Sequence, residues 1–246
     1  MKEITSLTNP YIKELAKLKD KKYLDKSDEF LVEGKHLVEE AYKNGCLKQI
    51  LSDDESFFID GIDCVKVTYE IIKKVTDTVN PQNIIGVVSK FENKIDTKKV
   101  KSIVILDAVS DPGNVGTIIR TAAGLGIDLV VLSNDSVDLY NPKVVRSTQG
   151  ALFSMKILKC DIKQFILDIK KEGIKVFGTA LYNSIDLRNV EKCEKYAIVL
   201  GNEAQGVKKE VLDLCDSNVR IDITNKIESL NVAIAGAIVM HYFINE

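Results

Sequence analysis

The sequence predicts an α/β protein in which a small mixed unit precedes a larger unit built on a parallel sheet. Its 246 residues are enough for one large or two modest domains with a buried core. Short β-rich apolar runs alternate with helical patterns, which is typical of parallel sheets covered by helices on both faces. A charged stretch that is poor in core residues, 91–101, separates the two patterns. We therefore expect domains at residues 1–92 and 102–246, joined by a linker at 93–101.

The first domain is expected to be a small alternating α/β unit. A helix should begin near Pro10, because a proline favours the first turn and apolar residues follow at helical spacing. Further helices are expected at 37–45 and 70–78, and apolar runs lie at 30–34, 49–51, 65–67 and 84–88.

The second domain carries longer apolar runs that read as buried strands. These strands are expected at 103–106, 129–132, 176–178, 198–200 and 219–223. The helices between and after them are expected at 114–125, 142–153, 162–172, 208–215 and 230–244. This order predicts a parallel sheet covered on both faces.

Composition excludes several classes of protein. The net charge of −2 and the 45% of hydrophobic residues are ordinary for a globular protein and do not fit a polybasic nucleic-acid tail. Five scattered cysteines without a C-x-x-C pair, and only two histidines, make a disulfide framework and a metal site poor expectations. No stretch approaches the length of a membrane span, and no apolar leader stands at the start. We expect a cytoplasmic protein without a metal.

Four polar clusters follow predicted strands, where open α/β sheets bind ligands. The first, 111–120, reads D-P-G-N-V-G-T-I-I-R and places two glycines at the start of a helix. With Asp135 about 20 residues further on, this spacing leaves a nicotinamide-dinucleotide site as an alternative, although its G-x-x-G lacks the G-x-G of that fingerprint.

The other three clusters also lie at the ends of predicted strands or at the starts of predicted helices. The second, 141–153, starts a helix at Pro142 and places Lys143 and Arg146 in its first turns, where cations oppose the helix dipole and suggest an anionic partner. The third, 198–207, runs from a strand into Gly201 and Glu203. The fourth contains E-S-L-N-V at 228–232, and Ser229 is the expected N-cap of the last helix.

Taken together and in this order, the four clusters resemble the SpoU family of S-adenosylmethionine-dependent RNA 2′-O-ribose methyltransferases, within the SPOUT class. The matching patterns are N-x-G-x-x-x-R from Asn114, N-P-K-x-x-R-x-x-x-G-A-L-F from Asn141, L-G-N-E-x-x-G from Leu200 and I-x-I-x-x-x-x-E-S-L-N-V from Ile221. The first domain, with F-L-V-E-G at 30–34, resembles the L30e-like RNA substrate-binding domain of many members. This resemblance implies a C-terminal SPOUT-type sheet with a trefoil knot.

The resemblance also implies roles for individual residues. Arg120 matches the essential arginine to which the family assigns proton abstraction. Because a guanidinium stays charged in proteins, binding a phosphate or stabilising the developing alkoxide is equally compatible with the resemblance, and its role stays open. Asn114 and Asn231 would hold the ribose or Arg120, Ser229 would add a hydroxyl, and Glu203 would orient the arginine. The family's S-adenosyl-L-methionine site maps to Thr179, Ala180, Leu200, Gly201, Ile221 and Leu230.

Partners follow from the same resemblance. A homodimer is expected, with RNA as substrate, and ribosomal RNA is favoured over transfer RNA because an additional N-terminal domain accompanies members that act on larger RNAs. Phosphate contacts require cations, for which we expect Lys13, Lys17, Lys21, Lys22, Lys143 and Arg146. A non-catalytic RNA-binding protein is a third possibility, but it would not need the set of Asn114, Arg120, Glu203, Ser229 and Asn231.

Overall fold

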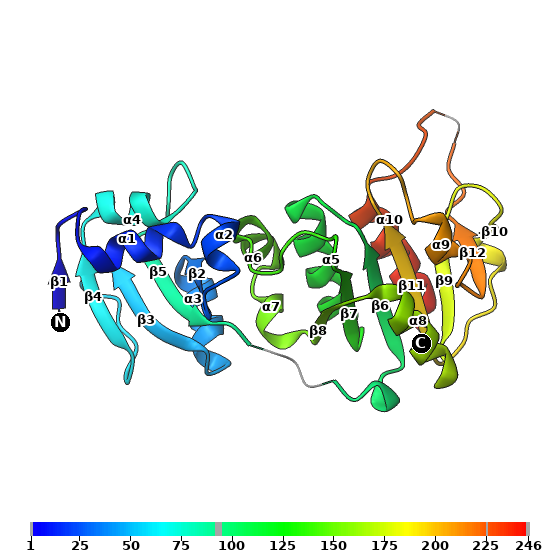
Figure 1. The fold of residues 1–246 in the computed structure, drawn as a ribbon, viewed down its shortest axis with the longest axis horizontal. Helices are drawn as coiled ribbons and strands as arrows, with labels where there is room; N and C mark the ends of the chain where they lie inside the picture. The colour runs from blue at the N-terminus through cyan, green and yellow to red at the C-terminus, as the bar shows by residue number, and fades with distance from the viewer. Residues whose placement is uncertain (1, 92–94, 225, 245–246) are drawn as a thin grey trace. The chain divides into compact units, whose positions relative to one another are not determined.

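The computed structural model of the chain describes residues 2–91, 95–224 and 226–244. Two compact units compose it: Met1–Glu92 with Asp138–Ser154, and Asn93–Val137 with Met155–Glu246. The segment Asp138–Ser154 thus belongs by its contacts to the first unit, although it lies in sequence between strands of the second (Figure 1). Among the described residues, no helix is both long and apolar enough to cross a membrane.

The first unit is built on a five-stranded mixed sheet in the order β1-β4-β3-β5-β2. β1, β3 and β4 run parallel to one another, whereas β5 pairs antiparallel with both β3 and β2. Asn9 caps the first helix by accepting a hydrogen bond from the Tyr11 N–H at 2.9 Å, and Pro10 opens it as expected. The strands are β1 (Lys2–Ile4), β2 (Glu29–Glu33), β3 (Leu47–Ser52), β4 (Asp63–Val67) and β5 (Ile84–Ser89), and the helices are α1 (Pro10–Lys17), α2 (Lys21–Leu24), α3 (Lys35–Lys43) and α4 (Tyr69–Val75).

The helix expected at 142–153 is two helices, α6 (Pro142–Thr148) and α7 (Ala151–Ser154). The chain turns between them because Gln149 and Gly150 both adopt positive φ, at 49° and 91°. A Cβ at residue 150 would also lie 2.9 Å from the Glu40 side chain, so glycine suits this turn for two reasons. The early end of α6 puts Arg146 in its last turn, where a cation favours the helix dipole. This corrects the expectation for Arg146, whereas Lys143 lies in the first turn as expected.

Aromatic rings hold the segment Asp138–Ser154 within the first unit. The Tyr140 ring lies 4.7 Å from that of Phe30 and 6.0 Å from that of Phe91, and Phe153 packs against the same pair. The Tyr140 hydroxyl donates a hydrogen bond to the Phe91 carbonyl at 2.8 Å. Phe30 is fully buried, so this cluster forms part of the hydrophobic core of the unit.

The second unit contains a seven-stranded sheet in the order β10-β12-β9-β11-β6-β7-β8, and every pairing in it is parallel. This confirms the predicted parallel sheet. Its strands are β6 (Ser102–Asp107), β7 (Leu129–Ser133), β8 (Ile157–Cys160), β9 (Lys175–Thr179), β10 (Ile185–Asp186), β11 (Tyr196–Gly201) and β12 (Ser217–Arg220), and its helices are α5 (Pro112–Gly124), α8 (Ile162–Lys171), α9 (Lys209–Leu212) and α10 (Val232–Phe243).

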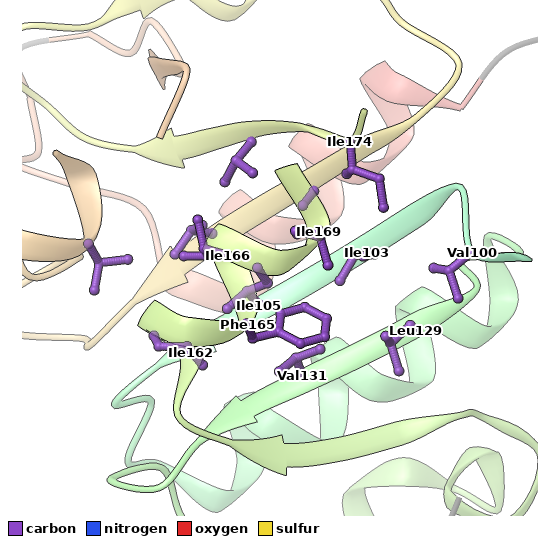
Figure 2. Packing of buried hydrophobic residues seen from close by; sticks show 14 of the residues in the cluster. Val100, Ile103, Ile105, Leu129, Val131, Ile162, Phe165, Ile166, Ile169 and Ile174 are labelled. Atoms are coloured by element: carbon purple, nitrogen blue, oxygen red, sulfur yellow. The ribbon is translucent and has the colours of Figure 1, made fainter. Parts of the chain in front are cut away.

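Helices cover both faces of this sheet. On one face, Phe165 and Ile166 of α8 face Ile105 of β6 and Val131 of β7 (Figure 2). On the other, α10 packs on β11 and against α5, and Gly236 lies over the Leu200 side chain. Successive residues of each strand therefore pack into the hydrophobic cores on opposite faces of the sheet, as expected for a sheet that is buried on both sides.

Within the expected linker 93–101, the structure describes residues 95–101, and residues 93 and 94 lie outside the described residues. The remainder forms a short 3-10 turn, Thr97–Lys99, in which the Asp96 side chain accepts a hydrogen bond from the Lys98 N–H. Val100 is buried and Ile95 packs against the same hydrophobic cluster as Phe165. The end of the expected linker is thus part of the core of the second unit.

Neighbouring residues of α8 test the core assignment. Ile166 is fully buried, whereas the side chain of the next residue, Leu167, is 44% exposed. Ile166→Ala should lower the free energy of unfolding by roughly 2–5 kcal/mol through lost burial and the cavity it leaves. Leu167→Ala should change it by about 0.5 kcal/mol or less. Urea denaturation of both variants measures the difference, and equal effects would contradict the packing of α8.

Candidate functional site

A cavity of about 750 Å³ lies at the carboxyl ends of β9, β11 and β12 and beside the start of α10. Its size is within the range of sites that bind small molecules. Five of the six residues expected to bind a cofactor line it: Thr179, Ala180, Gly201, Ile221 and Leu230. Leu200 does not, because its side chain is fully buried beneath Gly236 of α10.

Gly201 is required by a close backbone approach at the edge of this cavity. A Cβ at residue 201 would lie 2.1 Å from both the Gly206 carbonyl carbon and the Val207 nitrogen. The approach arises because the loop after β11 folds back on itself, with mutual hydrogen bonds between the backbones of Asn202 and Gly206. No other residue fits at position 201 without moving the backbone.

Glu203, inside this loop, accepts hydrogen bonds from the loop that precedes α5 and from the first turn of α5. Its Oε1 accepts from the Asp111 N–H at 3.0 Å and from the Asn114 side chain at 2.9 Å. Its Oε2 accepts from the N–H and the hydroxyl of Ser110 at 3.2 and 3.1 Å. One carboxylate thereby connects two loops that are about ninety residues apart in the chain.

Asn231 joins the same network from a third loop. Its side-chain nitrogen donates to the Asn114 oxygen at 2.9 Å, while its own oxygen caps α10 by accepting from the Ala233 and Ile234 N–H groups. The N-cap of α10 is therefore Asn231, which corrects the expectation of Ser229. Ser229 instead lines the cavity, and its hydroxyl makes no hydrogen bond with another described residue.

The environment of Glu203 keeps its carboxyl ionised. Partial burial alone would raise its pKa, but the hydrogen bonds from Asn114 and from backbone N–H groups outweigh that effect and lower the pKa to about 2. Such a carboxylate is a weak proton acceptor. Its contacts suit holding the loops in place more than taking a proton.

Arg120 lies outside this network. It is exposed on α5, does not line the cavity, and makes no hydrogen bond or ion pair with any residue in 2–91, 95–224 and 226–244. The structure does not bring it to Glu203, which was expected to orient it. Arg120 thus offers an uncommitted guanidinium to an anionic partner.

The six cations expected to bind RNA all lie in the first unit, on α1, α2 and α6. Three form ion pairs: Lys17 with Glu14 at 2.7 Å, Lys21 with Asp25 at 2.9 Å, and Arg146 with Asp77 at 2.5 Å. Lys13 and Lys22 are exposed and form no ion pair with another described residue, and Lys143 is also exposed. Exposed ion pairs are weak enough for a phosphate to replace the carboxylate.

The geometry does not support the nicotinamide alternative. Gly113 and Gly116 are inside α5, not in a loop before it, because Asp111 caps the helix by accepting from the Asn114 N–H at 2.9 Å. Asp135, the acidic residue of that interpretation, forms an ion pair with Lys208 at 2.6 Å. Among the described residues there is also no group of three or more His, Cys, Asp or Glu side chains that could hold a metal.

Several residues at the site were not identified from the sequence. Asn202 donates to the Ala108 carbonyl at 2.9 Å and accepts from the N–H groups of Ala204 and Gln205, so it shapes the loop that carries Glu203. Arg220 lines the cavity and donates to the Ser184 carbonyl. Asn202 stands in the L-G-N-E pattern and could have been found there, whereas no local signal marks Arg220.

Comparison with known proteins gives two family matches and several relatives. Residues 101–241 match the SpoU rRNA Methylase family, and residues 9–86 match the MRM3-like substrate binding domain. The chain is 39% identical to the 23S rRNA (guanosine(2553)-2′-O)-methyltransferase RlmP of Bacillus subtilis, over 98% of this chain and 99% of that protein.

Solved structures agree with these matches. The AdoMet-bound rRNA methyltransferase from Sinorhizobium meliloti superimposes with a TM-score of 0.88 at 30% identity, covering 98% of this chain and 96% of the other. The TrmH/SpoU tRNA modifying enzyme of A. aeolicus is similar over 59% of this chain and 75% of its own, with a TM-score of 0.53 at 28% identity.

The depressed pKa of Glu203 predicts a pH dependence of stability. Because the folded-state pKa, about 2, lies below the usual 4.5, the ionised carboxylate stabilises the fold fully above 4.5, and this contribution is lost as the pH falls towards 2. Glu203→Gln lacks it at every pH. Urea denaturation should therefore show a difference between wild type and variant that is constant above pH 4.5 and shrinks below it.

A matched control for this measurement is Glu210→Gln, which removes an exposed carboxylate paired with Lys163. We expect its stability to follow that of the wild type more closely. A Glu203→Gln difference that stayed constant down to pH 2 would contradict the hydrogen-bonding account.

Proposed function

The chain belongs to the SpoU rRNA methylase family, and we propose that it transfers a methyl group from S-adenosylmethionine to a ribose 2′-hydroxyl of ribosomal RNA. One observation carries this function most directly. The loop that carries Glu203, the first turn of α5 with Asn114, and the start of α10 with Asn231 are joined by hydrogen bonds, and Glu203 and Asn231 line a cavity that is large enough for the methyl donor. Pure RNA binding would not require this arrangement.

The cavity fits S-adenosylmethionine by its size and by its lining. Residues of the loops after β9, β11 and β12 line it, and Gly201 lets the backbone of the 201–207 loop approach the end of β11 closely. Leu230, Val232 and Ile221 add apolar surface for an aromatic base. The donor supplies a methyl group on a sulfonium, so the protein need not activate that group with a metal.

The residues of the chain would act mainly by positioning and by charge. Asn114 does not line the cavity, but both of its side-chain groups are committed to residues that do, Glu203 and Asn231, so its position is fixed. The Ser229 hydroxyl remains available to a ribose. Arg120 would bind a phosphate or stabilise the alkoxide that forms as the 2′-hydroxyl loses its proton, since a guanidinium stays charged. Glu203 would hold the loops and not accept that proton.

Ribosomal RNA is favoured over transfer RNA because the resemblance to rRNA enzymes includes both units. The relative named as a 23S rRNA methyltransferase aligns over 98% of this chain, whereas the tRNA modifying enzyme matches only 59% of it. The first unit would bind the RNA, with Lys13, Lys17, Lys21, Lys22, Lys143 and Arg146 as candidate phosphate contacts. Such an enzyme would act in the cytoplasm, with its ribosomal substrate.

A homodimer is supported by the surface of α10. Ile234 and Ile238 lie four residues apart on this helix and are 53% and 40% exposed. Together with the small residues Ala235 and Ala237, they form an apolar strip that a second copy could cover. The trefoil knot implied by the family stays a prediction, and the convergence of the loops after β9, β11 and β12 on one cavity is compatible with it.

The central prediction concerns Arg120. Arg120→Ala should reduce methyl transfer by roughly 100-fold or more, as expected when a group that stabilises transition-state charge is lost. Binding of S-adenosylmethionine should not change, because Arg120 does not line the cavity. Transfer of labelled methyl to deproteinised ribosomal RNA and to bulk transfer RNA, with donor binding measured by calorimetry, tests both statements.

Arg188→Ala is a matched control, because Arg188 is an exposed arginine of the same unit that pairs with Asp186 and Asp222. Full activity of Arg120→Ala would disprove the role of this residue. Label in transfer RNA alone would leave the enzyme class intact and overturn the choice of substrate.

The dimer surface gives a separate prediction. Ile234→Asp should convert a dimer into monomers, because a carboxylate would be buried without a partner in the interface. Ile185→Asp, at a residue that is 47% exposed on the edge strand β10, should leave the mass unchanged. Light scattering after gel filtration measures both, and a wild-type protein that runs as a monomer would argue against the dimer.

A further inference from the structure

Asp107, the last residue of β6, is a buried carboxylate to which the family pattern assigns no role. Its side chain is 1% exposed. Its Oδ2 accepts a hydrogen bond from the Lys208 N–H at 2.8 Å, while its Oδ1 has no hydrogen-bond partner among the described residues. The Lys208 ammonium lies 3.7 Å from Oδ1. Burying a carboxyl group with so few hydrogen-bond partners is unfavourable, so packing alone does not account for it.

Both ends of the loop that borders the cavity lie beside Asp107, one through backbone pairing and the other through a hydrogen bond to its carboxylate. Gly201, where the loop begins, is the partner of Asp107 in the register of β11 and β6. Lys208, which follows the loop, donates its N–H to Asp107. Every residue from Gly201 to Val207 lines the cavity, and Glu203 lies within this stretch. Asp107 therefore closes the loop from beneath.

The next residue directs the chain towards the same network. Ala108 adopts a positive φ of 55°, which is unusual for a residue with a side chain. Its N–H donates to the Ser133 hydroxyl and its carbonyl accepts from Asn202, both at 2.9 Å. The chain then continues to Ser110 and Asp111, whose N–H groups donate to Glu203. The turn at Asp107 and Ala108 thus leads into the loop that donates to Glu203, and it also contacts the 201–207 loop through Asn202.

A second cavity, of about 210 Å³, is lined by Asp107 and by other acidic residues, and Glu203 is not part of its lining. A ligand need not be invoked there. The Lys208 ammonium already lies 2.6 Å from Asp135 and 3.7 Å from Asp107, and it supplies the positive charge that this cavity requires. Lys208 is thus an internal counter-ion that ties the end of the loop to two carboxylates.

We propose that Asp107 is a positioning residue that holds the 201–207 loop in the conformation that binds S-adenosylmethionine, through the backbone N–H and the ammonium of Lys208. The proposal rests on the proposed function of the adjoining cavity. Asp107 itself does not line that cavity and need not contact the donor or the RNA. Its loss should therefore impair donor binding more than RNA binding.

The test compares Asp107→Ala with Asp107→Asn, using S-adenosylmethionine as the titrant in calorimetry. Asp107→Ala removes the acceptor for the Lys208 N–H and should weaken donor binding by at least about tenfold, the loss expected for a hydrogen bond to a charged group. Asp107→Asn keeps an acceptor oxygen and should recover most of that loss. In methyl-transfer assays the KM for the donor should rise in parallel, while the KM for ribosomal RNA stays within about twofold of wild type.

Thermal unfolding is monitored by circular dichroism, and the binding assays are run at a temperature at which every variant is fully folded. If Asp107→Ala does not fold, Lys208→Met tests the proposal instead. This variant removes the ammonium but keeps the backbone N–H, and it should raise the Kd for the donor a few-fold. Glu210→Gln, an exposed carboxylate of the second cavity that pairs with Lys163, should bind the donor as the wild type does.

Two results would overturn the proposal. The first is wild-type donor affinity in folded Asp107→Ala, or in Lys208→Met if the alanine variant is unfolded. The second is an equal loss of donor and RNA binding in the variant that is tested. A wild-type protein that bound no S-adenosylmethionine would instead refute the proposed function itself, so the two failures are distinguishable.

Discussion

The hydrogen bonds to the Glu203 carboxylate are the interaction on which the geometry of the cavity depends. A glutamate that accepts from Ser110, Asp111 and Asn114 makes one rigid edge from two loops, and Asn231 extends that edge to the start of α10. Backbone donors lower the pKa of the carboxyl and so keep it charged across the physiological range. The charge matters because an uncharged amide would attract the same N–H groups less strongly.

This constraint explains why a parallel sheet suits the function. Strands that run the same way end at one edge, so β6 and β11 deliver their following loops to the same place. The loop after β6 carries the donors, the loop after β11 carries the acceptor, and the closing helix α10 brings Asn231 from the far end of the chain. The relative position of these two loops is therefore set by the register of β6 and β11.

Residues whose role is set by local geometry could be predicted from the sequence. Gly201 follows a buried strand and precedes a carboxylate, and the structure shows that a side chain cannot fit there. The five long apolar runs of the second unit became strands because only a sheet buried on both sides requires such continuity. The edge strands β8 and β10 were missed, since they are only partly buried and lack the continuous apolar run of a strand that is covered on both faces.

Properties that depend on distant parts of the chain could not be predicted. The partner of Arg146 is Asp77, which lies 69 residues away, so a cation that looked available to RNA is paired. Leu200 matched the family pattern as a cofactor residue, but α10 covers it. Ser229 and Asn231 are equally good N-caps by residue preference, and Asn231, which also contacts Asn114, holds that position.

The membership of Asp138–Ser154 in the first unit has a consequence for how such a protein could have evolved. The chain passes between its two units three times, so neither unit is a continuous stretch of the gene. A recombination event that joined a foreign N-terminal domain at residue 92 would leave Val144 and Val145 without the partners that bury them. New RNA specificities would therefore arise more readily by gradual change in both segments together than by exchange of a whole module.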